Sequence, residues 1–278
     1  MPFGTVIADD RSTLDLADAD AIIAVMRTLR PDLVVNAGAY TAVDRAESER
    51  AQAFAVNALA PGVIAEEARR SGAVLIHYST DYVFDGSSPQ PYAEDAAVAP
   101  LSVYGASKLE GEQRIAASGA HALVFRTSWV YGLRGRNFLL TMRRLAAERD
   151  EIRVVDDQIG TPNWSRALAQ ATARVVGLRM PALVERAGLY HLSSSGRVSW
   201  HGFARAIIGD ATRPRLVPIA SSEYPAPARR PSHGVLDTGR FARTFGFSLP
   251  PWQQALAECL RSPAEPPVGP PLPDGAVS

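Results

Sequence analysis

Apolar residues in the first half of the chain alternate between a helical period and short continuous runs. Over residues 19–29 they recur every three or four positions, and this pattern stops before Pro31. A continuous apolar run follows over 33–37, which is typical of a strand buried on both faces. The same alternation predicts strands over 5–8, 74–78 and 122–127, and helices over 47–71 (interrupted around Pro61), 103–117 and 137–148.

Strands that alternate with helices in this way indicate parallel βαβ units covered on both faces. Beyond residue 155 the segments are shorter, with helices expected over 165–177, 200–208 and 252–260 and a strand over 189–192. We therefore expect an α/β fold, a Rossmann-like doubly wound parallel sheet with a small C-terminal α/β substrate lobe. The expected division is 1–155 for the dinucleotide-binding domain, with later segments interwoven, 156–261 for the substrate lobe, and 262–278 for a disordered proline-rich tail.

Composition narrows the function classes. The 278 residues carry 29 acidic and 29 basic side chains, so no net charge favours nucleic acid or an anionic membrane. The sequence shows neither a secretory leader nor an apolar stretch of the roughly 18 residues that a membrane span requires. A single cysteine, Cys259, excludes an intrachain disulfide, and we expect a cytoplasmic protein.

One basic residue differs from all the others. Arginine supplies 28 of the 29 basic side chains, and Lys108 is the only lysine. It follows Tyr104 by four residues at the start of a predicted helix, so both side chains project from one face. An ammonium near a phenol lowers the phenol pKa and lets tyrosine act as a general acid or base. The alternative is an exposed helix lysine beside a half-buried tyrosine.

Polar and small residues follow three of the predicted strands, at the carboxyl edge where open α/β sheets bind ligands. Thr80 and Asp81 could donate to a carbonyl oxygen and hold a sugar hydroxyl, or could merely cap the strand end. The small residues around Gly38 allow close approach of a flat ligand, or reflect tight packing. Trp129 suits a ligand contact and a core position equally well.

Together these segments resemble the extended short-chain dehydrogenase/reductases, and within them the dTDP-4-dehydrorhamnose reductase family. The resemblance covers about residues 5–260. Its motifs run from Arg30 to Asp44, His77 to Gly86, Pro100 to Glu112, Phe125 to Gly132 and Tyr224 to Pro231, with Asn137-Phe138 and Asp157-Gln158 between them. Nucleotide-sugar dehydratases usually place Asp-Glu after the threonine, and this chain has Asp81-Tyr82 instead, which favours a reductase.

The resemblance implies reduction of the 4-keto group of dTDP-4-dehydro-6-deoxy-L-mannose to dTDP-L-rhamnose by hydride from NADPH or NADH. It implies catalytic roles for Thr80, Tyr104 and Lys108, and contacts of Thr80, Asp81 and Trp129 with the substrate. The implied cofactor-binding residues are Asp15, Leu16, Ala39, Tyr40, Thr41, Tyr104 and Lys108. A homodimer is possible, and the five histidines lack the paired spacing of a metal site.

The sequence has a large departure from the family pattern at its beginning and a smaller one at Asn163, where the family more often has threonine. Such proteins open with a strand, a Gly-x-x-Gly-x-x-Gly turn and a helix whose N-terminus holds the cofactor pyrophosphate, and no such turn exists here. The first residues resemble the family's second strand, so roughly 25 residues, one strand, turn and helix, are expected to be missing. Strands 5–8 and 33–37 would then face a gap with unpaired backbone groups.

Two explanations for this departure stay open. The first is a start site placed downstream of the true one, or a truncated gene, for an ordinary reductase. The second is a shortened protein that has lost cofactor binding and acts as a non-catalytic binding or regulatory protein. The choice between NADPH and NADH is also open, because Asp9 and Asp10 suit a free ribose hydroxyl whereas Arg11 suits a 2′-phosphate.

Overall fold

A four-stranded parallel sheet forms the centre of the computed structural model, which describes residues 4–209 and 213–263. Its strands lie in the order β1-β2-β3-β8. Their bounds are β1 Leu33–Asn36, β2 Val74–Thr80, β3 Ala122–Thr127 and β8 Gly188–His191. All three strand pairs are parallel, so every carboxyl end lies at one edge of the sheet. The predicted α/β class with a parallel sheet is confirmed.

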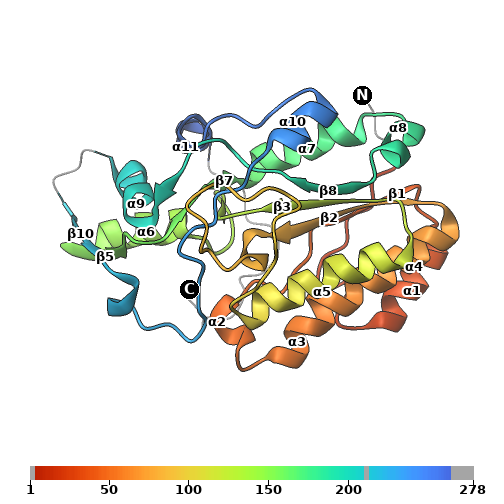
Figure 1. Ribbon diagram of the computed structural model, residues 1–278, viewed down its shortest axis with the longest axis horizontal. Helices are drawn as coiled ribbons and strands as arrows, with labels where there is room; N and C mark the ends of the chain where they lie inside the picture. The colour runs from red at the N-terminus through yellow and green to blue at the C-terminus, as the bar shows by residue number, and fades with distance from the viewer. Residues whose placement is uncertain (1–3, 210–212, 264–278) are drawn as a thin grey trace.

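Helices cover both faces of this sheet (Figure 1). One face carries α1 (Ala19–Leu29), α4 (Ala60–Ser71) and α5 (Val103–Ser118), whose apolar side chains pack on Leu75 and Val124. The other face carries α7 (Ser165–Val176), α8 (Met180–Glu185), α10 (Gly239–Phe245) and α11 (Trp252–Arg261). Their side chains form a second core with Ile76 and Phe125, because successive strand residues point to opposite faces.

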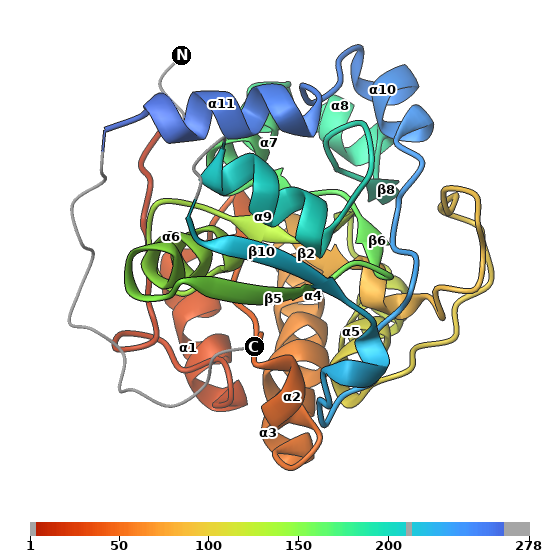
Figure 2. The same cartoon turned by 90° about the vertical axis from the view of Figure 1, so that its left-hand side faces the viewer.

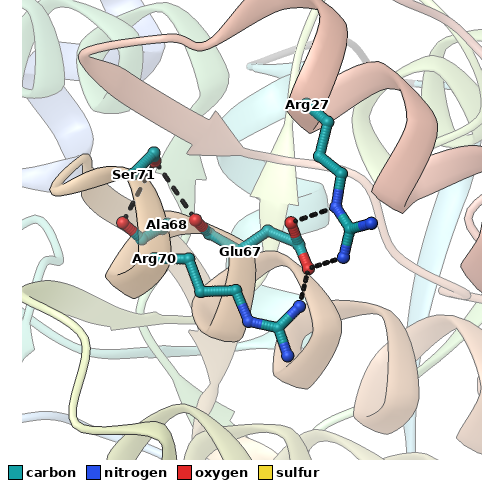
Figure 3. A network of polar contacts seen from close by, with 5 residues as sticks. All are labelled: Arg27, Glu67, Ala68, Arg70 and Ser71. Carbon is teal, nitrogen blue, oxygen red and sulfur yellow. Dashed lines mark hydrogen bonds and ion pairs between the residues drawn. The ribbon is translucent and has the colours of Figure 1, made fainter.

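An ion-pair network ties α1 to α4 where both helices end, near the amino ends of β1 and β2. Figure 3 shows Arg27 donating two hydrogen bonds to the Glu67 carboxylate, at 3.0 and 3.1 Å. Arg70 donates a third at 2.6 Å, while the Ser71 hydroxyl bonds the carbonyls of Glu67 and Ala68. The network therefore fixes the end of the sheet opposite to the predicted site.

A second, smaller parallel pair joins β5 (Glu151–Val155) to β10 (Arg215–Ile219), with α6 (Phe138–Glu148) and α9 (Trp200–Ile208) beside it (Figure 2). Two-stranded pairings connect β4 (Val130–Tyr131) to β7 (Asn163–Trp164) and β6 (Ile159–Gly160) to β9 (Val198–Ser199). The chain crosses between the lobes repeatedly, since β8 belongs to the main sheet. The domain bounds at 155 and 261 stay a prediction.

The predicted helix over 47–71 is broken into several pieces. These are α3 (Arg50–Phe54), a π-helical stretch η1 (Ala55–Leu59) and α4, and a separate short helix, α2 (Val43–Ala46), precedes them. The interruption thus begins before Pro61, which sits in the first turn of α4 as a proline can. The wider π turn coincides with buried Asn57, whose contacts are described below.

The prediction of a strand over residues 5–8 is wrong. This segment forms no strand in the structure, and Val6 and Ile7 are 74 % and 58 % exposed. Its β-branched residues favour a strand only if a neighbouring strand accepts their backbone hydrogen bonds. Among the described residues, β1 pairs with β2 alone, and Val35 of β1 is 43 % exposed.

The proline-rich tail predicted from residue 262 lies outside the described residues from residue 264 onward. In the described part of the chain, no helix combines the length and apolarity needed to cross a membrane.

Candidate active site at the carboxyl edge of the sheet

Thr80 and Asp81 lie where β2 ends, and both are buried. The Thr80 hydroxyl accepts a hydrogen bond from the backbone N–H of Tyr82 at 3.2 Å and donates one to the Asp81 carboxylate at 3.1 Å. Burial raises the pKa of Asp81 to about 7, against the opposing effect of the Thr80 bond. The strand end therefore supplies a hydroxyl and a carboxyl group that is partly protonated near neutrality.

Tyr104 sits in the first turn of α5, which begins beside this strand end. The Ser102 side chain caps the helix by accepting from the N–H of Gly105 at 3.2 Å, and Glu47 accepts from the N–H of Val103 at 2.9 Å. A Cβ on Gly105 would lie 2.2 Å from the Tyr82 carbonyl oxygen, so this close approach requires glycine. The helix start is consequently held directly against the segment that follows Thr80.

The acidity of Tyr104 differs from the expectation drawn from its spacing to Lys108. Burial raises the pKa of Tyr104 to about 12, while a hydrogen bond with Thr80 acts in the opposite direction and Asp81 adds to the rise. Lys108 is not among the groups that shift this pKa. The structure thus holds Tyr104 as a protonated acid, and the expected lowering by an ammonium is absent from it.

Lys108 is fully buried one helical turn further along α5. Its ammonium donates to the Tyr78 carbonyl at 2.6 Å and lies 3.2 Å from Nε2 of His77. Burial lowers the pKa of Lys108 to about 8, and burial together with the Lys108 charge holds the pKa of His77 well below its usual value. A neutral His77 accepts from Lys108 at Nε2, and one ammonium proton is left for a ligand.

The segments predicted to bind the cofactor converge on the same edge. A Cβ on Gly38 would lie 2.6 Å from Cδ1 of Leu16, so the turn after β1 packs on the segment before α1. Asn57 exchanges hydrogen bonds with the backbone of Tyr40, at 2.8 and 3.0 Å, and donates to Ser107 at 3.0 Å. Asp15 is exposed, and its carboxylate accepts from the N–H of Ala17 at 2.9 Å.

The residues present fit one end of a nicotinamide dinucleotide and not the other. Lys108, with its unused proton, and Tyr104 suit the nicotinamide ribose. The pyrophosphate normally lies on a glycine turn at a helix N-terminus, and the sequence has no such turn.

Trp129 follows β3 at the same edge, because Thr127 lies opposite Thr80 in the strand register. Its backbone has φ of 42°, an uncommon conformation for a bulky residue. Its ring stacks on Trp200 of α9 at 3.5 Å between centroids, and a Cβ on Gly160 would lie 2.4 Å from it. The Trp129 side chain therefore packs between Trp200 of α9 and Gly160 of β6.

The family model described as RmlD substrate binding domain matches residues 3–264. The chain belongs to this family.

Named members of the RmlD substrate binding domain family resemble the chain over nearly its full length. The dTDP-4-dehydrorhamnose reductase of Burkholderia thailandensis is 45 % identical over 270 residues, which is 93 % of this chain and 91 % of the relative. That of Escherichia coli K12 is 42 % identical, over 93 % and 90 % of the two chains. The crystal structure of the Bacillus anthracis reductase in complex with NADP matches at a TM-score of 0.85 and 35 % identity, covering 91 % and 88 %.

Sequence reasoning missed several residues that hold this family member's site together. His77 and Asn57 carry polar side chains within otherwise apolar or helical segments, and that pattern is a usable signal for a buried polar partner. Trp200 follows Ser199 at a helix start and resembles an ordinary core residue.

The described residues contain no group of three or more His, Cys, Asp or Glu side chains arranged to hold a metal ion.

Replacing Asp81 by Asn is expected to change how the stability of this family member depends on pH. Because the folded-state pKa of Asp81, about 7, lies above the ordinary 3.8, its contribution to stability is fully present below pH 4 and is lost as pH rises to 7. Asp81→Asn removes this loss, so its stability relative to the original chain should improve by on the order of 2 kcal/mol between pH 5 and pH 8.

Urea unfolding at both pH values measures this difference. Asp85→Asn is the matched control, because bonds from Ser87 lower the pKa of Asp85 and its replacement should not produce the same gain. An equal stability difference for Asp81→Asn at pH 5 and pH 8 contradicts the assignment.

Proposed function

We propose that this protein reduces dTDP-4-dehydro-6-deoxy-L-mannose to dTDP-L-rhamnose with NADPH or NADH. The observation that carries the proposal is the convergence of Thr80, Tyr104 and the lone Lys108 at the carboxyl edge of the sheet. Its relatives of 42–45 % identity are named dTDP-4-dehydrorhamnose reductase, and a relative of known structure is described in complex with NADP. Oxidation of NADPH or NADH at 340 nm, a wavelength at which only the reduced cofactor absorbs, tests the reaction with this keto sugar.

The chain's own residues divide the work of a carbonyl reduction. The nicotinamide, when bound, supplies the hydride. The Thr80 hydroxyl has a single proton, which must turn from the Asp81 carboxylate to the keto oxygen to polarise it, and Tyr104 gives its proton to the alkoxide that forms there. Lys108 would hold the nicotinamide ribose, and its positive charge would favour the phenolate left on Tyr104.

On the substrate side, Asp81 orients a sugar hydroxyl and Trp129 contacts the sugar. The clamped ring and uncommon backbone of Trp129 support this assignment, because such conformations cluster at ligand sites. The non-catalytic alternative is not favoured, because the hydroxyl donor Thr80 and the only lysine of the chain are retained and buried, and the acid Tyr104 lies half-buried beside Thr80.

The pyrophosphate end of the cofactor needs a further element. We propose that a parallel strand with a glycine turn and a helix lies against the open edge of β1. The one-sided pairing of β1 and the exposed side chains of Val35, Val6 and Ile7 support this.

The cytoplasmic location and the homodimer also stay predictions. Light scattering of the purified protein tests the homodimer.

Extending the chain upstream in its reading frame is therefore expected to raise cofactor affinity at least about tenfold, because the added turn supplies amide donors to the pyrophosphate. Fluorescence titration of NADPH against both forms measures the affinity, and soluble yield is recorded alongside. A short form that binds and turns over as well as the extended one contradicts the extra strand. A well-folded pair of forms that both lack activity contradicts the reductase.

A further inference from the structure

The segment 228–237, here called the strap, leaves the second lobe and crosses the catalytic segment that follows β2. A Cβ on Gly86 would lie 2.6 Å from Pro231, and one on Gly234 would lie 2.4 Å from the Asp81 carboxylate. The Tyr92 backbone bonds Val235 and Asp237 at 2.9 and 2.8 Å. The strap thus lies directly on Asp81, one of the residues proposed to bind the sugar.

One ion pair attaches the beginning of the strap to the Rossmann-like domain. Arg230 donates two hydrogen bonds to the Asp44 carboxylate, at 2.7 and 3.0 Å. The N–H of Ala228 donates to the same carboxylate at 3.1 Å. Asp44 belongs to α2, just after β1, and Figure 1 shows the blue segment between β10 and α10 passing beside α2.

The pair is well enough shielded from water to matter energetically. The side chains of Arg230 and Asp44 are only 15 % and 22 % exposed. A forked guanidinium on a carboxylate is the strong, geometrically specific form of an ion pair. The bonds from Arg230 and Ala228 hold the pKa of Asp44 below its usual value although burial opposes them, so the pair stays charged at neutral pH.

The pair also reaches the catalytic tyrosine through one neighbour. Arg230 interacts electrostatically with Tyr82, and the Tyr82 ring packs edge-on against Tyr104 at 5.5 Å between centroids. The Tyr82 carbonyl is the atom that meets Gly105 at the start of α5. Arg230 and Tyr104 are therefore both linked to Tyr82, the first through its charge and the second through ring packing.

We propose that Asp44 and Arg230 are positioning residues for the reduction, which anchor the strap against Asp81 at the sugar site. The inference rests on the proposed function. It assigns the pair a role in turnover through geometry, with no contact to the reacting atoms.

The variants Asp44→Asn and Arg230→Gln test this, with exposed Arg229→Gln as the matched control. Each variant of the pair is expected to lower kcat about tenfold while KM for cofactor and sugar nucleotide stays within about twofold, because misplaced groups cost rate more than binding. The double variant should lose no more than the worse single variant, since the two residues act as one unit. The kcat of Arg230→Lys, which keeps the charge but not the forked guanidinium, should lie between those of the original chain and Arg230→Gln.

Amide hydrogen exchange over 228–236 gives a readout that does not depend on activity. Exchange in the strap is expected to speed up at least about tenfold in both single variants and to stay unchanged in Arg229→Gln. Unchanged exchange overturns the anchoring even if the reaction proves to be another one. Weakened binding of dTDP in Arg230→Gln but not in Asp44→Asn would show that Arg230 is a ligand contact, and additive losses in the double variant would also overturn the inference.

Discussion

Tyr104→Phe is expected to lower turnover at least about tenfold, within the roughly 10²- to 10⁴-fold that a positioned acid is worth, while leaving cofactor binding largely intact. The hydroxyl is the only group removed, and the phenylalanine ring can keep the edge-on contact with Tyr82. With its pKa raised to about 12 by burial, Tyr104 carries its proton across the physiological range and is ready to donate it to an alkoxide. The packing should therefore survive while the proton source is lost.

Steady-state rates and NADPH titration of the same preparation separate these effects. Tyr190→Phe is the control, because it removes a buried hydroxyl bonded to the Arg186 carbonyl, in β8 and outside the site. It should turn over within about twofold of the original chain. Unchanged turnover in Tyr104→Phe would show that another group supplies the proton, and the pair Thr80 and Asp81 would be the next to test.

The elements that sequence patterns predicted well are those whose stability is local. The helix over 19–29 has an aspartate cap, an apolar stripe and a defined end, and α1 spans these same residues. The strand over 122–127 is likewise found as β3. For α1, the cap and the periodic apolar face specify the element locally, whereas β3 was found because its continuous apolar run is buried on both faces between β2 and β8.

Elements that depend on a distant partner could not be predicted in this way. β5 and β10 pair although 64 positions separate Glu151 from Arg215. The segment 5–8 has strand composition, yet its backbone meets no neighbour and stays unpaired. Strand formation is a property of a pair, so composition alone decides neither case.

The site residues show the same difference between local features, which the sequence predicts, and long-range contacts, which it does not. The residues quoted from motifs, Thr80, Asp81 and Tyr104, lie together because one strand end and one helix start carry them. The strap's ion pair could not be predicted in this way, because Arg230 bonds Asp44 across 186 positions. The pKa of Tyr104 could not be predicted from the sequence either, because it depends on burial more than on the spacing to Lys108.

Lys108→Ala is expected to weaken nicotinamide binding and to lower the rate together, each by at least about tenfold, because one ammonium both holds the ribose and stabilises the phenolate. Because Lys108 is fully buried, the alanine variant also leaves a cavity and removes a hydrogen-bond partner from the Tyr78 carbonyl and from His77. Lys108→Met keeps most of the volume without the charge and is the variant to compare. Lys108→Arg should not restore activity, since its broader fork does not fit a space filled by two fixed partners.

The pH profile supplies an independent check on this role. Since burial lowers the pKa of Lys108 to about 8, the free enzyme should lose the ammonium, and with it kcat/KM, as pH rises through 8. Lys108→Met should lose that descending limb together with its rate. NADPH titration in the form of the chain that turns over separates the two functions: normal cofactor affinity in Lys108→Met would show that the ribose is held by other groups, and an unchanged rate would show that the phenolate needs no ammonium.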